Sequence, residues 1–137
     1  MNKHLFLVLI LVSSFYNANA LHVFSTQLQY QCLGNGQYII TLKTYQECGA
    51  SIVVPTSLVV EARSYSCAVN PISFTLPIIP SLSGDMVTPY CNNFIGQTAC
   101  NGGNLPSEDI AIYQDTISLP MECPDWKISA EPATRSS

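Results

Sequence analysis

The chain has 137 residues, of which 10% are charged, and nine acidic residues against five basic ones give a net charge of −4. This length is enough for one domain with a modest hydrophobic core. The sequence contains no basic patch, which argues against nucleic-acid binding, because phosphate neutralisation supplies most of the affinity of such complexes.

Residues 1–20 have the organisation of a cleavable secretory signal peptide. A short positive start precedes an unbroken apolar run over residues 5–12, and Ala18 and Ala20 occupy the small-residue positions of a cleavage site. The run is much shorter than the roughly 20 residues that a membrane-spanning helix requires, and no later stretch is long enough either. We therefore predict a secreted protein whose mature chain begins at Leu21 and has no transmembrane segment. A buried N-terminal strand is the alternative interpretation of the apolar run.

The first part of the mature chain predicts a β-hairpin. Gln27–Leu33 alternates apolar and polar residues, and Gln37–Tyr45 is rich in β-branched and aromatic residues. Between them lies Gly34-Asn35-Gly36, whose residues tolerate the positive φ angles that a tight hairpin turn requires.

Several short strands are predicted after the hairpin. Beyond a loop around Cys48, Ser57–Arg63 has apolar residues on one face, and Ile72–Leu76 alternates until Pro77 ends it. The residues of Asn92–Pro106 are typical of loops. The remaining predicted strands are Met86–Tyr90, Ile110–Leu119 (a strand pair or one bent strand) and Trp126–Ser129.

Many short strands separated by turns, without a convincing helix, predict an all-β fold. We expect a disulfide-bonded antiparallel β-sandwich, immunoglobulin-like or related. The sandwich domain is expected to span residues 21–129, and residues 130–137 are small and polar and predict a flexible tail.

Six cysteines follow the predicted cleavage site, and their even number in an exported chain predicts disulfide bonds. A zinc site is the alternative, but its ligands usually come in close pairs such as C-x-x-C, and the shortest gap here is eight residues. The six are Cys32, Cys48, Cys67, Cys91, Cys100 and Cys123.

Hairpin geometry excludes one pairing and the shortest gap favours another. Cys32 lies near the predicted turn, and Cys48 lies about 30 Å away along the second strand, whereas a disulfide requires Cα atoms within about 7 Å. Cys91–Cys100 closes a small loop and is the predicted local bridge. The other pairings stay open, because six cysteines allow fifteen arrangements.

Catalytic chemistry finds little support in the sequence. His22, the one histidine of the mature chain, lies two residues from the predicted new N-terminus, where ordering is usually poor. Glu108 and Asp109 are adjacent, so on a strand their carboxylates point to opposite faces and make a poor acid–base pair. We expect no enzyme, no catalytic residue and no cofactor.

Metal and phosphate sites are also weakly indicated. Asn101, Asn104, Glu108 and Asp109 carry oxygens that calcium prefers, but no EF-hand spacing is present, so we expect no metal site. The segment Asn101-Gly102-Gly103-Asn104 lacks the lysine and the following helix of a phosphate-binding loop, and we interpret it as a turn.

The aromatic residues could stack on sugars if they were exposed, but on strands most are expected to fill or cover the core. For Trp126 we favour a place against the core over a ligand platform. The ligand-binding residues remain unknown at this stage. The set comprises Tyr30, Tyr38, Tyr45, Tyr65, Tyr90, Tyr113 and Trp126.

Several segments together resemble the N-terminal region of large surface proteins of surface-gliding Gram-negative bacteria, usually labelled gliding motility-associated C-terminal domain proteins. The resemblance covers roughly Leu28 to Ser129. Its segments are Tyr30-Gln31-Cys32-Leu33-Gly34-Asn35, Tyr38-x-Ile40-Thr41-Leu42-x-x-Tyr45-x-x-Cys48-Gly49, Cys100-Asn101-Gly102-Gly103-Asn104-Leu105-Pro106 and Leu119-Pro120-x-x-Cys123-x-Asp125-Trp126.

This resemblance implies export, delivery to the cell surface by type IX secretion, and a part in adhesion, gliding motility or the extracellular matrix. It implies no catalytic residue. Members of that family are usually much longer, with repeat modules and a C-terminal sorting domain, and this chain stops at Ser137 without them. A periplasmic location therefore stays open beside the extracellular or cell-surface one.

The leading hypothesis is a non-enzymatic structural or adhesion module of the cell surface. The alternative is a small secreted module that binds carbohydrate or protein, favoured if Tyr90, Tyr113 or Trp126 is exposed on one face. The sequence identifies no single partner and leaves two classes open, other surface proteins and extracellular glycans.

Overall fold

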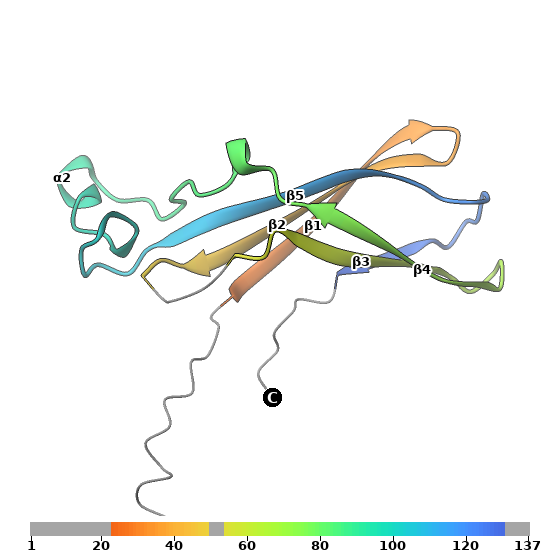
Figure 1. Cartoon of the computed structure of the whole chain (residues 1–137), viewed down its shortest axis with the longest axis horizontal. Helices are drawn as coiled ribbons and strands as arrows, with labels where there is room; N and C mark the ends of the chain where they lie inside the picture. Colours follow the sequence, from red (N-terminus) through yellow and green to blue (C-terminus); the bar gives the residue numbers. More distant parts are fainter. Residues whose placement is uncertain (1–22, 50–53, 131–137) are drawn as a thin grey trace, which may run out of the picture.

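The computed structural model describes residues 23–49 and 54–130, so the predicted signal peptide, His22 and the tail from residue 131 lie outside it. The described strands form two antiparallel three-stranded sheets, with the orders β1-β2-β5 and β4-β3-β6 (Figure 1). The strands are β1 (Val23–Gly34), β2 (Gln37–Glu47), β3 (Ser57–Ser64), β4 (Val69–Pro77), β5 (Glu108–Ser118) and β6 (Lys127–Ala130).

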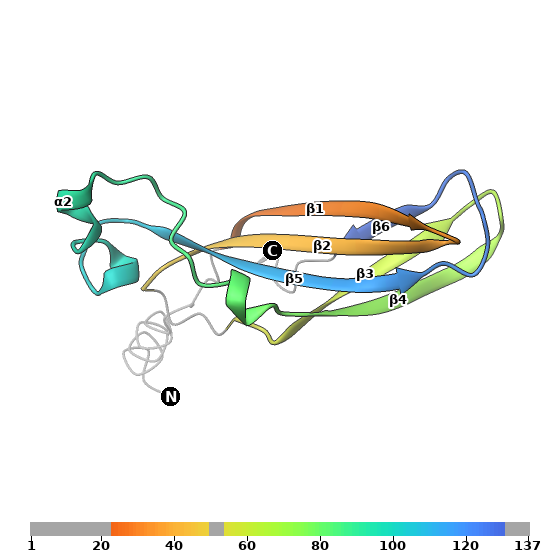
Figure 2. The same ribbon diagram turned by 90° about the horizontal axis from the view of Figure 1, so that it is seen from above.

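The two sheets pack together, which confirms the predicted all-β, disulfide-bonded sandwich. They meet along one margin, where Ile78 at the end of β4 forms an isolated bridge to Tyr113 of β5. At the opposite margins lie β1 of one sheet and β6 of the other. Seen from above, β1 and β4 lie on opposite sides of the molecule (Figure 2).

The β1–β2 hairpin has the predicted form. Its strands pair antiparallel, with Tyr30 opposite Ile40 and Leu28 opposite Leu42. The turn residues Gly34, Asn35 and Gly36 have φ angles of 94°, 52° and 72°. Such left-handed conformations are cheap only for glycine and, to a lesser degree, asparagine, which is why this tripeptide ends the strand.

The core lies between β2 and β5 on one side and β3 and β4 on the other. Alternate residues of β3 are buried, as predicted from their apolar pattern, and Tyr113 of β5 is 1% exposed. The tyrosine hydroxyl donates a hydrogen bond of 3.0 Å to the carbonyl oxygen of Pro55. The buried apolar residues are Ile40, Leu42, Leu58, Val60, Ala62, Leu76, Ala111, Tyr113, Ile117 and Leu119.

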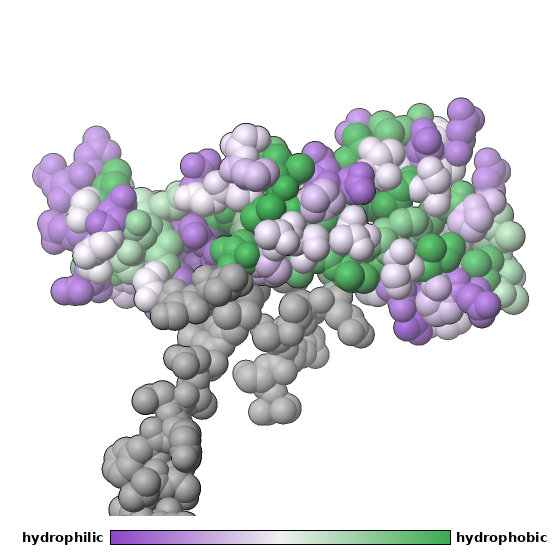
Figure 3. All heavy atoms as spheres, viewed as in Figure 1, coloured by the Kyte–Doolittle hydropathy of each residue, from purple (hydrophilic) through white to green (hydrophobic). Residues whose placement is uncertain are grey.

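The segment between β4 and β5 contains only short helical turns, in keeping with the predicted loop. They are the 3-10 helices η1 (Pro80–Leu82) and η2 (Ala99–Asn101) and the four-residue helix α2 (Asn92–Ile95). None of the described helices has the length and apolar character needed to cross a membrane. In the view of Figure 3, hydrophilic residues gather at the end that carries α2, and hydrophobic residues reach the surface over the strands.

The predicted strand Met86–Tyr90 is wrong. Met86 forms one isolated bridge to Asp109, and the Thr88 hydroxyl then accepts a hydrogen bond of 2.8 Å from the amide of Glu108. A side-chain oxygen thus takes the place of a backbone acceptor, and Pro89 has no N–H to continue the ladder. Pairing therefore stops after a single bridge.

All six cysteines lie in the described residues, and four of them form two disulfides, Cys48–Cys100 and Cys67–Cys123. The predicted local bridge Cys91–Cys100 is wrong, and so is the expectation that all six are paired. Cys32 and Cys91 are free and exposed.

A shared partner explains why Cys100 bonds to a distant cysteine. The carbonyl oxygen of Ser107 accepts from the amide of Cys48 at 2.9 Å, and the Ser107 hydroxyl accepts from the amide of Cys100, also at 2.9 Å. Both cysteines are therefore held beside the start of β5. Cys91 precedes helix α2 instead and points into solvent. The exclusion of Cys32–Cys48 is confirmed.

Candidate functional site

The outer face of the β4-β3-β6 sheet carries polar and charged side chains. Because Leu58, Val60 and Ala62 point into the core, the intervening residues of β3 point outward. Glu61 lies opposite Ser73 of β4 and Ser129 of β6. This alternation places a charged side chain between two hydroxyl groups in the middle of the sheet.

A basic pair follows at the next outward position of β3. Arg63 lies opposite Lys127 of β6, and its guanidinium Nε forms an ion pair with the carboxylate of Glu61. Both partners of this ion pair are partly open to water, so its contribution to stability is small. The ion pair lies along the outer face of the sheet, because both residues occupy outward positions of β3.

A shallow open depression of about 920 Å³ runs over this face. Its walls combine hydroxyl, charged, aliphatic and aromatic groups, the mixture that binding surfaces use to orient a partner. The lining residues are Pro55, Ser57, Leu58, Val59, Glu61, Arg63, Tyr65, Ser73, Lys127, Ile128 and Ser129.

Tyr65 stands at one end of the depression, in the turn between β3 and β4, and is 73% exposed. Ala68 of the same turn has a φ angle of 49°, an uncommon conformation for a residue with a side chain. An exposed aromatic on a loop usually loses much side-chain and backbone entropy when it binds. The interactions that hold this turn therefore determine how much backbone entropy is lost when Tyr65 binds a partner.

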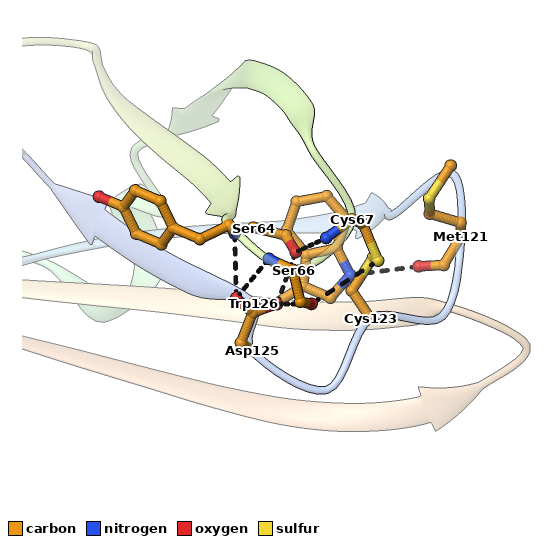
Figure 4. Close-up of a disulfide and its surroundings, with 8 residues drawn as sticks. Ser64, Ser66, Cys67, Met121, Cys123, Asp125 and Trp126 are labelled. Carbon is orange, nitrogen blue, oxygen red and sulfur yellow. Dashed lines mark hydrogen bonds between the residues drawn. A yellow bond between two sulfur atoms is a disulfide. The ribbon is translucent and has the colours of Figure 1, made fainter.

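The carboxylate of Asp125 holds the turn (Figure 4). Its Oδ1 accepts hydrogen bonds from the hydroxyls of Ser64 and Ser66, at 2.6 and 2.5 Å. Its Oδ2 accepts from the backbone amides of Tyr65 and Ser66, at 3.0 and 2.9 Å. These bonds, first of all the one from Ser64, hold the pKa of the Asp125 carboxyl well below its usual range, since each favours the charged form.

A disulfide bond and the indole ring of Trp126 also stabilise the turn that carries Tyr65. Cys67–Cys123 links the turn to the segment that carries Asp125, with a Cα–Cα distance of 6.1 Å. The indole Nε1 of Trp126 donates to the carbonyl oxygen of Met121 at 3.1 Å, and the ring packs against the core. The backbone around Tyr65 is thus fixed by hydrogen bonds on both sides and by a covalent link.

Such a turn presents the aromatic side chain on a backbone that is already ordered before binding. The flat apolar face of a tyrosine suits the C–H face of a sugar ring or an apolar pocket of a protein, and its hydroxyl can donate or accept. Glu61, Arg63 and the serines of the sheet face supply polar partners next to it. The arrangement suits binding of a partner.

The aromatic residues singled out in the sequence lie elsewhere. Tyr113 is buried in the core, and Tyr90 is partly buried with its hydroxyl donating to the carbonyl oxygen of Pro106 at 2.6 Å. Trp126 packs against the core, as predicted. Tyr65 was named in the sequence only as one of seven aromatic residues, because its exposure depends on contacts between Asp125 and a turn about 60 residues away.

Of the residues whose oxygens were considered for calcium, Asn101 belongs to a short 3-10 helix and Glu108 and Asp109 to strand β5. The Asn101 amide donates to the Ile95 carbonyl and to the Thr98 hydroxyl, both at 3.0 Å, which confirms a turn there. Glu108 and Asp109 are successive residues of β5. Within residues 23–49 and 54–130, no group of three or more histidine, cysteine, aspartate or glutamate side chains could hold a metal ion.

Asp109 has one unusual feature. Its Oδ1 is buried and has no hydrogen-bond partner, and it is the only such side-chain atom among the described residues. It borders a small open depression of about 250 Å³ that Gln46 and Gly84 also line.

Comparisons of the chain with models of protein families, with curated proteins and with solved structures found no match. The functional reading of the site therefore depends on its own geometry. That geometry consists of a polar sheet face, a shallow depression and a tyrosine fixed at its end.

Proposed function

We propose that this chain is a non-enzymatic, extracytoplasmic module that serves adhesion or cell-surface structure and binds its partner around Tyr65. Three features support the proposal: the signal-like residues 1–20, the two disulfides and the sandwich fold. Disulfides persist in oxidising compartments outside the cytoplasm. The resemblance to gliding-associated surface proteins adds type IX delivery to the cell surface, with a part in gliding, as the finer form of the proposal.

The observation that carries the proposal is the fixed exposure of Tyr65. The ring is 73% exposed, while the backbone on both of its sides is bound to Asp125 and linked by Cys67–Cys123. A core-forming tyrosine would be buried, and an incidental surface tyrosine would need no such fixation. Preorganised aromatic anchors of this kind commonly dominate the binding energy of an interface.

A carbohydrate-binding module is the second candidate, and the composition of the depression favours it. Hydroxyl groups of Ser57, Ser73 and Ser129 and the charged Glu61 line the same surface as the exposed ring. Sugars are bound by stacking on an aromatic face together with hydrogen bonds to their hydroxyls. A strongly apolar protein partner would suit this polar surface less well.

Binding is tested with the exported full-length chain, labelled and applied to glycan arrays and to cell-envelope and extracellular-matrix fractions of its native host. We expect Tyr65→Ala to weaken binding about tenfold, a typical loss for an interface aromatic. Phe94→Ala is the matched control, because Phe94 is also an exposed aromatic but lies on helix α2. Equal binding by both variants would remove Tyr65 from the site.

Location and chemistry have their own tests. Protease treatment of intact and of permeabilised host cells separates a surface protein, which is cut in both, from a periplasmic one. Hydrolase activity on polysaccharide or peptide substrates that Glu108→Gln or Asp109→Asn abolishes would contradict a non-enzymatic role. Unchanged adhesion and gliding after deletion of the gene would contradict the finer proposal.

A further inference from the structure

Three of the four sheet margins in the described structure are protected against pairing with another chain. The margin of β5 is covered by the segment that follows β4. The amides of Ile79, Gly84 and Val87 donate to the carbonyls of Ile112, Ile110 and Glu108, at 2.7 to 2.9 Å. Such cover removes the free backbone groups that would otherwise template a further strand.

The margins of the other sheet are protected by sequence. Strand β4 contains Pro71 and Pro77, which have no N–H to offer a new partner. Strand β6 comprises four described residues and begins with the exposed, charged Lys127. Prolines, charges and short length are the usual devices that blunt an edge strand.

Strand β1 has none of these devices. It runs for 12 residues, VFSTQLQYQCLG, without a charge or a proline. It pairs with β2 on one side, and no described strand pairs with its other side. Every second N–H and C=O of the stretch Ser25–Cys32 therefore points away from the molecule.

The inner face of β1 is only partly covered, since Leu28 packs against the core but Tyr30 does not. Tyr30 lies opposite Ile40, which is fully buried, yet Tyr30 itself is 72% exposed. Its ring meets the ring of Tyr38 edge to face, with centroids 6.5 Å apart. The core thus extends to β1 at Leu28 but leaves Tyr30 open next to the edge.

We propose that a second copy of this chain occupies the open edge, with the two β1 strands paired antiparallel across a two-fold axis at Gln29. The β1-β2-β5 sheet then continues across the dimer as six strands. Self-association through β1 does not depend on the binding face around Tyr65.

Symmetry makes β1 complementary to itself. A two-fold axis perpendicular to the sheet keeps each face of the strand on the same side, so odd-numbered residues meet odd-numbered ones. With the axis at Gln29, Gln27 pairs with Gln31 of the other copy, and Leu28 pairs with Tyr30. Amides then face amides, and an aliphatic side chain covers an aromatic one on the inner face.

The absence of charge points to the same occupant. A strand with a different sequence is often selected by complementary charges, and β1 carries none. Two copies of an uncharged strand meet without repulsion. Pairing also buries the exposed faces of Leu28 and Tyr30 that the second sheet leaves open.

The test measures the mass in solution of the exported full-length chain by sedimentation, in a Cys32→Ser, Cys91→Ser background that removes thiol cross-linking. We expect a dimer whose Kd rises at least tenfold in Gln29→Lys, which sets two like charges opposite each other at the axis. Thr75→Lys, the same kind of change on the β4 margin, is the matched control and leaves the dimer intact. Circular dichroism checks that each variant is folded.

A cross-link tests the register. In the same background, Gln29→Cys places two thiols at the axis, and oxidised glutathione takes two electrons and two protons from them as one disulfide forms between the copies. A covalent dimer supports the proposal. A monomer at every concentration, or a dimer that Gln29→Lys leaves unchanged, overturns it, as does cross-linking of position 29 in the native host only to a different protein.

Discussion

The hydroxyl of Ser64 donates a hydrogen bond of 2.6 Å to Oδ1 of Asp125, across 61 positions of the sequence. The same carboxylate receives three further hydrogen bonds from the turn, one from the hydroxyl of Ser66 and two from the amides of Tyr65 and Ser66. One side chain therefore joins the end of β3 to the segment before β6. Loss of that side chain should loosen the turn and both segments that it connects.

Asp125→Asn should lower Tm by roughly five degrees at neutral pH, because an amide has one acceptor oxygen where the carboxylate has two. The folded-state pKa of Asp125 lies below its usual 3.8. The stability that it contributes is therefore present at pH values above 3.8 and is lost as the pH falls through 3.8 toward the folded-state pKa.

The Tm difference between the wild type and Asp125→Asn should accordingly shrink as the pH is lowered from 7 to below 3. Circular dichroism melts over this range measure it. Asp115→Asn is the control, because Asp115 is exposed and its carboxylate accepts a hydrogen bond from the amide of its own neighbour, Thr116. A difference that stays constant with pH would show that the Asp125 charge is not what holds the turn.

The two exposed thiols predict a specific labelling result. Iodoacetamide applied without reduction should add two labels to the folded chain, and the intact mass should be lower by four hydrogens than that of the fully reduced chain, because Cys48–Cys100 and Cys67–Cys123 are closed. Cys32→Ser and Cys91→Ser should each remove one label. A chain that takes no label would instead carry a third bridge, within one molecule or between two.

The architecture was predictable because it depends on local patterns. Alternation in β3 and the Gly34-Asn35-Gly36 turn each involve residues close in sequence, and both were predicted correctly. The disulfide pairing was not, since it depends on which distant segments meet. The role of Ser107 in bringing Cys48 and Cys100 together leaves no mark in the spacing of the cysteines.

The candidate site was missed for the same reason. Nothing in the sequence around Tyr65 distinguishes it from six other tyrosines, several of which lie on strands. The conformation of its turn depends on Asp125, about 60 positions away. The outward direction of Glu61 and Arg63 indicates a shared polar surface only when β6 is known to lie beside β3. Contacts of long sequence separation carry the functional information in this fold.

Tyr113→Phe removes a buried hydroxyl that donates to the Pro55 carbonyl, so it should cost about 1 kcal/mol of unfolding free energy. Burial also raises the pKa of Tyr113 above its usual 10.0. The stability that it contributes is full below pH 10.0 and is lost as the pH rises toward the folded-state pKa.

Denaturant titrations at pH 7 and above pH 10 test both statements about Tyr113. The control is Tyr30→Phe, which should leave stability within about 0.5 kcal/mol of the wild type, because Tyr30 is 72% exposed. If the two variants were equally stable, the Tyr113 hydroxyl would contribute nothing beyond a surface group.

Gly103 and Gly96 form a matched pair in the loop between α2 and β5. A Cβ atom added at Gly103 would lie 2.0 Å from the backbone oxygen of Gln97, whereas one added at Gly96 would have no atom within 4 Å. The amide of Gly103 donates to the carbonyl of Thr98, and those of Leu105 and Ala99 form the bridge that closes the loop. Gly103→Ala must therefore displace backbone and weaken this bridge, at a cost of roughly 1–3 kcal/mol.

Amide hydrogen exchange measures the weakening of this bridge at the amides that form it. In Gly103→Ala the amides of Ala99 and Leu105 should exchange at least tenfold faster than in the wild type, because they donate to the carbonyls of Leu105 and Gln97 across the bridge. In Gly96→Ala, where φ is −70° and space is open, both amides should keep their protection. Equal protection in the two variants would mean that the loop is not closed by these bonds in solution, and that the Cys48–Cys100 disulfide alone holds it against β2.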